Sequence, residues 1–239
     1  EKYLEQTIQS VINQTYPNIE YIIIDGGSTD RTLDIIKKYE DNIDYWVSEK
    51  DNGIYDAMNK GLRLATGKII GFLNSDDIYA NQYVLENVFY HMTKSKVDSC
   101  YSDLVYVNRD NIEKIHRYWK AGEFKRENFK WGWMLPHPTF FVKYKIYKKY
   151  GFFNFKFRLA ADYELMLRFL YKYKISTCYI PKVLIKMRSG GTSKPGLSTL
   201  IGILECYKAW KVNNLNYPLG VLLKPVRKII QYISKRRLM

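Results

Sequence analysis

Carboxylate side chains follow directly on apolar runs at two places in this 239-residue sequence. Asp25 ends the isoleucine run 22–24, and Asp76 and Asp77 come shortly after the apolar run 69–73. Ligands of open α/β sheets bind at the carboxyl ends of the strands, so acids at these points indicate a ligand-binding site. One isolated Asp in such a place is more often a turn residue or a helix cap. Two such places at neighbouring strand ends favour the ligand site.

The elements that must position these acids alternate between helical and extended patterns. Apolar residues have helical spacing near residues 4–12, 28–39 and 54–65. Short apolar or β-branched runs, typical of strands, occupy residues 21–24, 45–47 and 69–73. Strands that alternate with helices predict a parallel-type sheet with helices on both faces.

The pattern changes after a predicted helix at about 82–94. Strand-like segments at 99–107, 112–119 and 139–142 lead us to expect that the sheet becomes mixed. A helix at about 162–173, a strand near 178–180, a polar loop at 189–193 and two helices broken by Pro218 and Pro225 complete the chain. No internal repeat or low-complexity linker divides the sequence, which favours one catalytic domain with a helical C-terminal extension.

Four segments together resemble the successive signatures of family 2 glycosyltransferases with the GT-A fold. They lie at residues 25–32, 51–61, 67–77 and 161–165, in the family's order and spacing. The resemblance implies an α/β, GT-A (Rossmann-like) fold, with a mostly parallel mixed sheet flanked by helices. It also implies a catalytic domain at 1–195, followed by a basic helical extension at 196–239.

The activity that this resemblance implies is inverting sugar transfer of the hexosyltransferase type. The donor would be a nucleoside diphosphate sugar, with UDP favoured, and the acceptor a saccharide or lipid-linked saccharide in surface polysaccharide biosynthesis. The residues expected to bind the donor are Asp25, Gly26, Asp51, Gly53, Asp56, Asn59, Asn74 and Arg188. Asp25 would contact the base or ribose, and the segment 53–61 would pass beside the nucleotide and the sugar. Arg188, before the polar loop 189–193, is similar to a residue of a mobile loop that closes over the donor and meets a phosphate; the alternative is an ordinary loop.

Residues 74–76 occupy the family's Asp-X-Asp position, which implies a metal-dependent enzyme with Mn²⁺ or Mg²⁺ on the donor diphosphate. A hard ion held by oxygen ligands stabilises the negative charge that develops on the diphosphate leaving group. Asn74 stands where the first Asp is usual and supplies no charge, so metal affinity would depend on Asp76, Asp77 and the phosphates. Asp76 is favoured over Asp77 as the direct ligand.

Asp162 matches the family's catalytic base, which removes the acceptor hydroxyl proton during direct inversion. The alternative is that Asp162 caps the helix that follows it. His137 and Trp133 are candidates for the acceptor side, because flat aromatic faces stack well on sugar rings. The competing interpretation places both in the core, where most Trp and lone His residues of this kind lie.

The net charge of +14 is concentrated at one end of the sequence. Residues 165–239 contain 15 basic side chains and one acidic one, whereas residues 1–164 are balanced at 23 of each. Segment 219–239 has the pattern of a basic amphipathic helix, which predicts contact with an anionic membrane surface; a packing helix with a solvated basic edge is the alternative. We expect a cytoplasmic protein, peripheral on the inner face of the cytoplasmic membrane, because no membrane-spanning run, signal peptide or disulfide framework is visible.

Family members normally begin with a strand that forms part of the nucleotide pocket, and this sequence starts in the helix after it. We therefore expect a fragment whose sheet has a central gap or an exposed edge. Two other functions compete with glycosyl transfer. A sugar nucleotidyltransferase would share the strand-end acids, but the segments around Asp25 and Asp162 do not fit it. A non-enzymatic membrane or nucleic-acid binding module is suggested by charge alone, and acids at the strand ends argue against a nucleic-acid partner.

Overall fold

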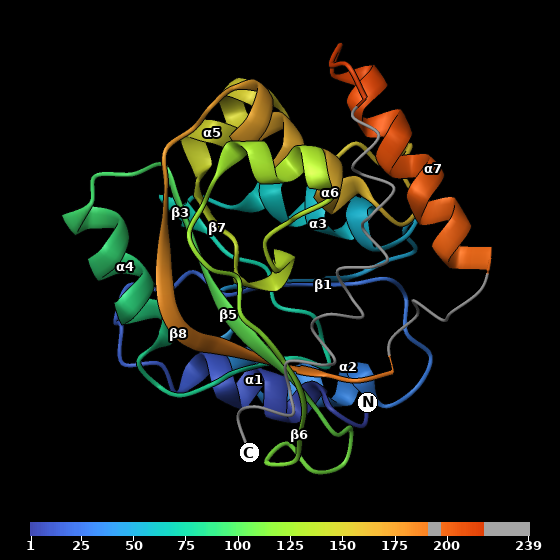
Figure 1. The fold of residues 1–239 in the computed structure, drawn as a ribbon. Coiled ribbons are helices and arrows are strands. Elements are labelled where there is room, and N and C mark those ends of the chain that lie inside the picture. Colours follow the sequence, from blue (N-terminus) through green and yellow to red (C-terminus); the bar gives the residue numbers. More distant parts are fainter. Residues whose placement is uncertain (191–196, 218–239) are drawn as a thin grey trace.

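The computed structural model of the protein describes residues 1–190 and 197–217 (Figure 1). Its first layer contains α1 (Leu4–Ile12), β1 (Ile22–Asp25), α2 (Thr32–Lys38), a short 3₁₀ turn (Glu40–Asn42) and β2 (Tyr45–Ser48). β1 and β2 pair in parallel, from Ile22 opposite Tyr45 to Asp25 opposite Ser48. Buried apolar side chains from α1 and α2 pack together with this pair. The helical spacing noted at 4–12 therefore marks the face that α1 buries.

A larger sheet forms the second layer. It contains β3 (Ile69–Ile70), β4 (Ile78–Tyr79), β5 (Ser99–Val107), β6 (Ile115–Trp119), β7 (Phe141–Lys143) and β8 (Thr177–Arg188). Its strand order is β3-β7-β5-β8-β4, and β6 pairs with β5. β5 and β8 are parallel, whereas the other pairs within this sheet are antiparallel among the described residues. The sheet is mixed, as expected, but it contains more antiparallel pairing than the alternating sequence pattern suggested.

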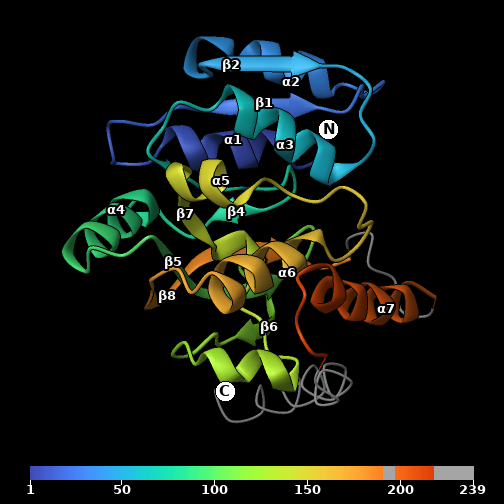
Figure 2. The same ribbon diagram turned by 90° about the horizontal axis from the view of Figure 1, so that it is seen from above.

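Helices cover both layers (Figure 2). α3 (Ile54–Leu64) lies against β1, and α4 (Val84–Lys94) packs near β5 and β8. Two 3₁₀ turns (Arg126–Trp131 and His137–Thr139) precede β7, and α5 (Tyr144–Tyr150) follows it. The helix expected at 162–173 consists of α6 (Ala161–Met166) and a π-helical turn (Leu167–Lys172).

α7 (Leu197–Val212) packs against α6. The indole N–H of Trp210 donates a hydrogen bond of 2.8 Å to the Tyr163 hydroxyl. The predicted basic helix at 219–239, with its breaks at Pro218 and Pro225, lies outside the described residues, so the division at residue 195 stays a prediction. Among the described residues, no helix is both long enough and apolar enough to cross a bilayer.

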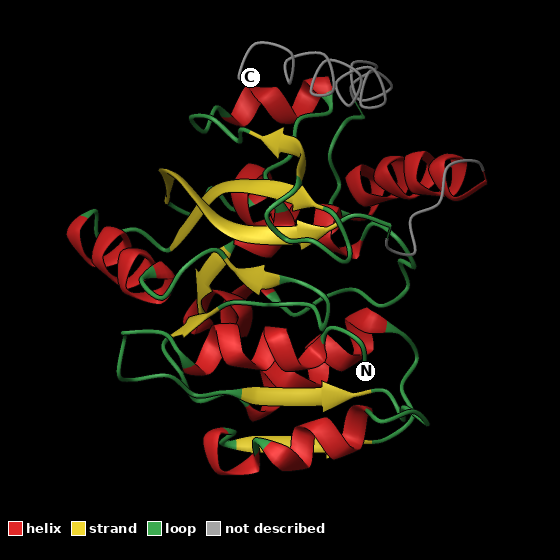
Figure 3. Ribbon diagram, turned by 90° about the horizontal axis from the view of Figure 1, so that it is seen from below, coloured by secondary structure: helices red, strands yellow, loops and turns green. Residues whose placement is uncertain are grey.

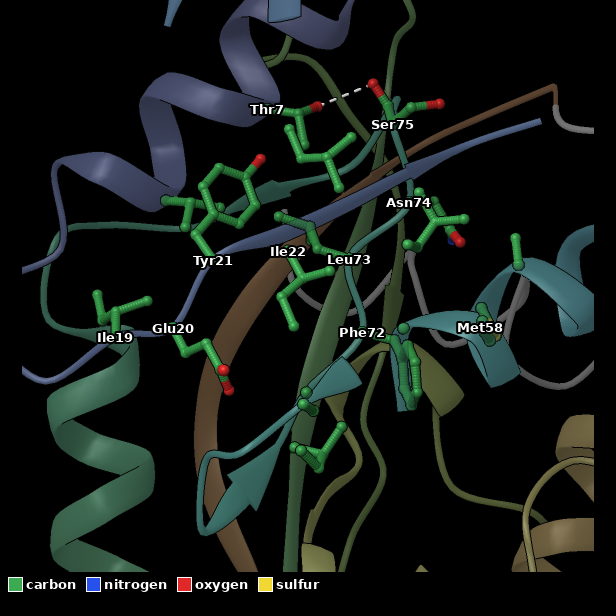
Figure 4. A pocket seen from close by; sticks show the side chains of 18 of the residues that line it. Thr7, Ile19, Glu20, Tyr21, Ile22, Met58, Phe72, Leu73, Asn74 and Ser75 are labelled. Carbon is green, nitrogen blue, oxygen red and sulfur yellow. Dashed lines mark hydrogen bonds between the residues drawn. The ribbon is translucent and has the colours of Figure 1, made fainter. Parts of the chain in front are cut away.

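The two sheets are not hydrogen-bonded to each other within the described residues, and Figure 3 shows them as separate groups of strands. Residues of β1 and β3 line the space between them. A cavity of about 1170 Å³ occupies this region. Apolar side chains such as Ile22 and Leu73 line it from both sides (Figure 4). The described strands therefore form two separate sheets, and the expectation of a missing first strand stays a prediction. β3 is shorter than the predicted 69–73 strand, and Gly71 lies so close to the Phe141 ring that a Cβ atom there would come within 2.4 Å of it.

Candidate active site

Asp25 is buried at the carboxyl end of β1, where its carboxylate organises the loop that follows. Its Oδ2 accepts hydrogen bonds from the Gly27 N–H, the Ser28 N–H and the Ser48 hydroxyl, at 3.0, 2.8 and 2.6 Å. Oδ1 accepts the Ser28 hydroxyl at 2.6 Å. Burial acts to raise the pKa of Asp25, but these hydrogen bonds outweigh it and hold the pKa below its ordinary value. Asp25 is therefore an ionised anchor of the loop at one end of the cavity.

Asp51 lies directly against Gly26. A Cβ atom at Gly26 would stand 2.6 Å from Asp51 Oδ2, so glycine is needed for this approach. Asp51 Oδ1 accepts the Gly53 N–H at 2.8 Å, and Gly53 has a φ of 106°, which favours glycine at the start of α3. Asp56 accepts the N–H and the side-chain amide of Asn52, which lower its pKa. Of these residues, Gly26 and Asp51 line the cavity.

Thr7 of α1 holds the loop 74–77 in place. The Thr7 hydroxyl donates to the carbonyl oxygens of Ser75 and Asp77, at 2.9 and 2.8 Å (Figure 4). The Asn74 side-chain amide donates to Asp77 Oδ2 at 2.9 Å. Asp76 lines the cavity, and its side chain is 30% exposed. The two acids of this loop therefore have different environments.

Asp77 is buried beneath the loop, and its carboxylate does not line the cavity. Burial raises its pKa to about 7, and the neighbouring Asp76 adds to this, while hydrogen bonds from Asn74 and the Arg188 N–H act in the opposite direction. Asp77 thus supports the loop from inside. Of the two acids, Asp76 is the one that faces the cavity.

Arg188 does not face the cavity, contrary to the role expected for it. It is buried at the end of β8, and its guanidinium donates to the carbonyl oxygens of Arg109 and Asp76 at 3.1 and 2.5 Å, and to Gln6 Oε1. A buried guanidinium needs acceptors on all its nitrogens, and here the protein supplies them. Arg188 therefore anchors the loop of Asp76 rather than extending toward a ligand.

Arg109 is a cavity residue that the sequence patterns did not single out. It follows the end of β5, its side chain is 40% exposed, and its Nη2 lies 4.0 Å from Asp76 Oδ2. Its Nη1 donates to the Gly190 carbonyl at 2.7 Å, and its Nε to the Tyr3 hydroxyl at 3.3 Å. The strand-end rule that identified Asp25 would also have found Arg109, had it been extended from acids to cations.

The protein oxygen atoms around Asp76 can bind a divalent cation only if the substrate supplies further ligands. Within residues 1–190 and 197–217, no group of three or more His, Cys, Asp or Glu side chains gathers around one point. Asp76 offers one hard carboxylate facing the cavity, and the carbonyl of Asp76 is already used by Arg188. A hard ion accepts such a single carboxylate together with phosphate oxygens and water. The site fits an ion that arrives with a diphosphate.

Asp162 lies in the first turn of α6, in an aromatic environment. Its Oδ1 accepts the Tyr55 hydroxyl at 3.3 Å and the Tyr163 N–H at 2.7 Å. Ala160 is the N-cap residue, and no side chain caps this helix, so the geometry does not favour the capping alternative. Among the described residues, Oδ2 of Asp162 receives no hydrogen bond. Tyr55 belongs to α3, whose other face lines the cavity, so this helix connects Asp162 with the cavity wall.

His137 lies close to this acid. Its ring is 6.3 Å from Phe72, which lines the cavity, and 5.7 Å from Phe153. Burial lowers the pKa of His137, and the nearby Asp162 charge opposes this. The net effect is a pKa of His137 below its ordinary value, which favours the neutral imidazole.

Two of the predicted site residues contact other parts of the protein rather than the cavity. Trp133 packs among Phe124, Phe129 and Tyr101, and its indole N–H donates to a backbone carbonyl. These contacts agree with the alternative given in the sequence analysis, in which Trp133 belongs to the core. Asn59 is buried, and its amide makes two hydrogen bonds of 2.9 Å with the backbone of Phe153. Both ends of the amide are thus engaged by the backbone of Phe153, and Asn59 does not line the cavity, so the geometry does not favour contact of Asn59 with a sugar donor.

The sequence-predicted residues that converge are those at the polar end of the cavity. Asp25, Gly26, Asp51, Asn74 and Asp76 all line it. They come from the ends of β1, β2 and β3, and therefore from both sheets. This arrangement combines hydrogen-bond acceptors for a polar ligand with one carboxylate for a cation and an apolar interior beneath them.

Comparison of the sequence with known families gives a match to Glycosyl transferase family 2 over residues 1–151. An uncharacterized glycosyltransferase of Mycobacterium tuberculosis is 33% identical over 168 residues, which are 69% of this chain and 63% of that protein. The matched part thus spans less than two thirds of the length of this relative.

The fold is similar to that of S. aureus TarS in complex with UDP-GlcNAc. The TM-score is 0.69 at 20% identity, over 94% of this chain and 66% of that chain. A mannosyltransferase from Pyrobaculum calidifontis, in complex with GDP-Man and Mn²⁺, gives a TM-score of 0.60 at 16% identity, over 94% and 60% of the two chains. At such identities the likeness concerns the fold, and it confirms the expected GT-A architecture.

Proposed function

Because this chain belongs to glycosyl transferase family 2, we propose that it transfers a sugar from a nucleoside diphosphate donor, UDP in the first instance, with inversion. The acceptor is a saccharide or lipid-linked saccharide in surface polysaccharide biosynthesis. The observation that supports this best is the convergence of Asp25, Asp51 and Asp76 at the polar end of one cavity.

The donor occupies this polar end. Asp25, held rigid by four hydrogen bonds, and the backbone around Gly26 meet the nucleoside, while Asp51 and Asn74 offer acceptors for ribose hydroxyls. The diphosphate lies toward Asp76 and Arg109. A cation and a carboxylate 4.0 Å apart can bind a metal-bound diphosphate together, the carboxylate through the ion and the guanidinium through a phosphate oxygen.

Asp76 would hold Mn²⁺ or Mg²⁺ together with the donor phosphates. The ion, when bound, stabilises the negative charge of the departing diphosphate. The mannosyltransferase in complex with GDP-Man and Mn²⁺ supports a divalent ion in this fold. Thr7 and Arg188 keep the Asp76 backbone in place for this purpose.

Asp162 is the general base of this proposal. Tyr55 and the Tyr163 N–H hold its Oδ1, which leaves Oδ2 to accept the proton of the attacking hydroxyl. The acceptor hydroxyl oxygen attacks the anomeric carbon from the side opposite the diphosphate, and the bond between that carbon and the diphosphate oxygen breaks. The configuration therefore inverts, and no covalent enzyme intermediate forms. His137, whose ring stacks on the cavity residue Phe72, belongs to the acceptor side of this proposal.

Calorimetric titration of UDP into the protein, with and without Mn²⁺, tests the donor half of the proposal. We expect saturable binding that depends on the metal. Replacing Asp76→Asn should weaken it about tenfold or more, as the loss of a charged contact worth about 1.5 kcal/mol or more implies. The exposed Asp41, remote from the cavity, provides the matched control Asp41→Asn, which should bind like the unchanged protein.

Absence of UDP binding under both conditions would remove the uridine donor, and the same titration with GDP would follow. Metal-dependent binding that survives Asp76→Asn would contradict the assignment of the ligand.

A further inference from the structure

α7 exposes apolar side chains on the face turned away from the core. Its inner face buries Cys206, Ala209 and Trp210 against α6 and its neighbours. On the outer face, Leu200 and Leu204 are 61% and 66% exposed, and Tyr207 is 49% exposed. The spacing of these three residues, i, i+4 and i+7, puts them on one stripe of the helix. Within the described residues, the Tyr207 ring packs against Tyr217, with 4.9 Å between the ring centroids, while Leu200 and Leu204 stay largely exposed.

A second segment with exposed apolar side chains, the loop at 154–160, lies beside α7. Both carboxylate oxygens of Glu205 on α7 accept backbone N–H groups of residues 158–160, at 2.8 to 2.9 Å, so the loop is fixed beside the helix. Phe155 and Leu159 of this loop are exposed as well. The helix and the loop are thus held side by side, and each exposes apolar side chains.

The charges around these apolar groups have one sign. Lys156, Arg158, Lys208 and Lys211 are exposed, on the loop and on α7. Glu205 lies between them but is turned inward to the loop backbone, as its three hydrogen bonds require. We call the set of nine exposed residues the α7 surface; its members are Phe155, Lys156, Arg158, Leu159, Leu200, Leu204, Tyr207, Lys208 and Lys211.

We propose that the α7 surface docks on an anionic lipid bilayer. Apolar side chains flanked by basic ones are the composition of elements that lie in the headgroup region, with the apolar groups inserted and the basic groups at the phosphates. A second copy of this chain is a poorer occupant, because a twofold contact through the same surface would bring its four cations opposite those of the partner.

Docking here would also orient the candidate base. The loop of the α7 surface continues without interruption into Ala161 and Asp162. A lipid-linked acceptor that stays in the bilayer would therefore reach the protein near the start of α6, the helix that carries Asp162. This consequence rests on the proposed function, whereas the docking itself is measured without donor or acceptor.

Sedimentation of the full chain with vesicles tests the proposal. One set of vesicles is phosphatidylcholine alone, and the other contains about 30% phosphatidylglycerol by composition. We expect binding to the anionic vesicles that falls as salt is added, and little binding to the neutral ones. Lys208→Gln with Lys211→Gln should lower the partition coefficient about 25-fold, which corresponds to about fivefold for each cation.

Leu200→Ser with Leu204→Ser should lower partitioning about tenfold or more, because the buried apolar area is lost. These side chains are exposed, so the variants should keep the circular dichroism and unfolding midpoint of the parent. The matched control is Tyr90→Ser with Lys94→Gln, an exposed aromatic and its neighbouring cation on α4. Figures 1 and 2 show α4 on the opposite side of the molecule from α7.

Three results would overturn the proposal. Equal binding to both kinds of vesicle would remove the role of the cations, and an equal loss in the α4 control would show that no particular surface is used. No vesicle binding, together with a dimer that the leucine variant dissociates in light scattering, would assign the surface to self-association. UDP titration of the same leucine variant separates these results from the donor site, which should bind normally.

Discussion

Replacing Arg188 distinguishes an anchor of the Asp76 loop from a ligand of the donor. The Arg188→Met variant keeps most of the side-chain volume but removes hydrogen bonds to two carbonyl oxygens and to Gln6. Each is a part-buried bond from a charged donor, for which we take the low end of the usual range, about 1.5 kcal/mol, so the free energy of unfolding should fall by about 4.5 kcal/mol. With a urea m-value of about 3 kcal/mol/M for a chain of this size, the unfolding midpoint should drop by about 1.5 M.

Urea unfolding followed by circular dichroism measures this change, and Arg31→Met serves as the control. Arg31 is exposed, and its replacement should change the free energy of unfolding by less than about 0.5 kcal/mol. The reasoning would be refuted if Arg188→Met left the midpoint unchanged while UDP affinity fell. That combination is what a guanidinium reaching toward a donor phosphate would produce, as the sequence pattern first suggested.

Three further predictions concern other parts of the site. Asp162→Asn should reduce the rate of sugar transfer by about 10² to 10⁴ while leaving UDP affinity unchanged, and an active variant would show that another group takes the acceptor proton. Asn59→Ala should lower the free energy of unfolding by about 2 to 3 kcal/mol, because two backbone groups of Phe153 lose their partner; a stable variant with weakened donor binding would return Asn59 to the donor site. Gly26→Ala should weaken UDP binding, since the new Cβ displaces Asp51, and unchanged affinity in the same titration would place the donor elsewhere.

Local patterns predicted those site residues whose place depends on the nearest strand. Asp25 and Asp76 follow apolar runs, and the edge of a sheet brings such positions together without further information. Arg188 and Asn59 were different, because their environments depend on partners far away in the sequence. Arg188 bonds to groups 79 to 182 residues away, and Asn59 to a backbone 94 residues away. No spacing rule indicates whether such a polar side chain faces a ligand or another part of the chain.

The ends of a strand can also depend on residues far away in the sequence, which local patterns do not reveal. The sequence predicted a strand near 178–180, and the next residue, Pro181, lacks the N–H that a regular ladder needs. In the structure β8 continues to Arg188, because the register against β5 shifts beyond Ile180 and pairing resumes at Val183. The strand is therefore extended by its partner, β5, whose pattern predicted 99–107 correctly from nine consecutive residues.

In the proposed function, the bound nucleotide would join the two sheets across the cavity between β1 and β3. Asp25 ends β1, Asp51 follows β2, and Asp76 lies in the loop after β3. A nucleotide that contacts all three would span a boundary that no strand pairing crosses within the described residues. Binding at 100 times the dissociation constant would stabilise the joined state by about 2.7 kcal/mol. Amide hydrogens of β1 and β2 that exchange by separation of the sheets should then exchange about 100-fold more slowly. Without nucleotide, the two-stranded sheet would separate more often from the rest of the protein. Binding of the nucleotide would then slow amide hydrogen exchange even at residues that do not contact the sugar.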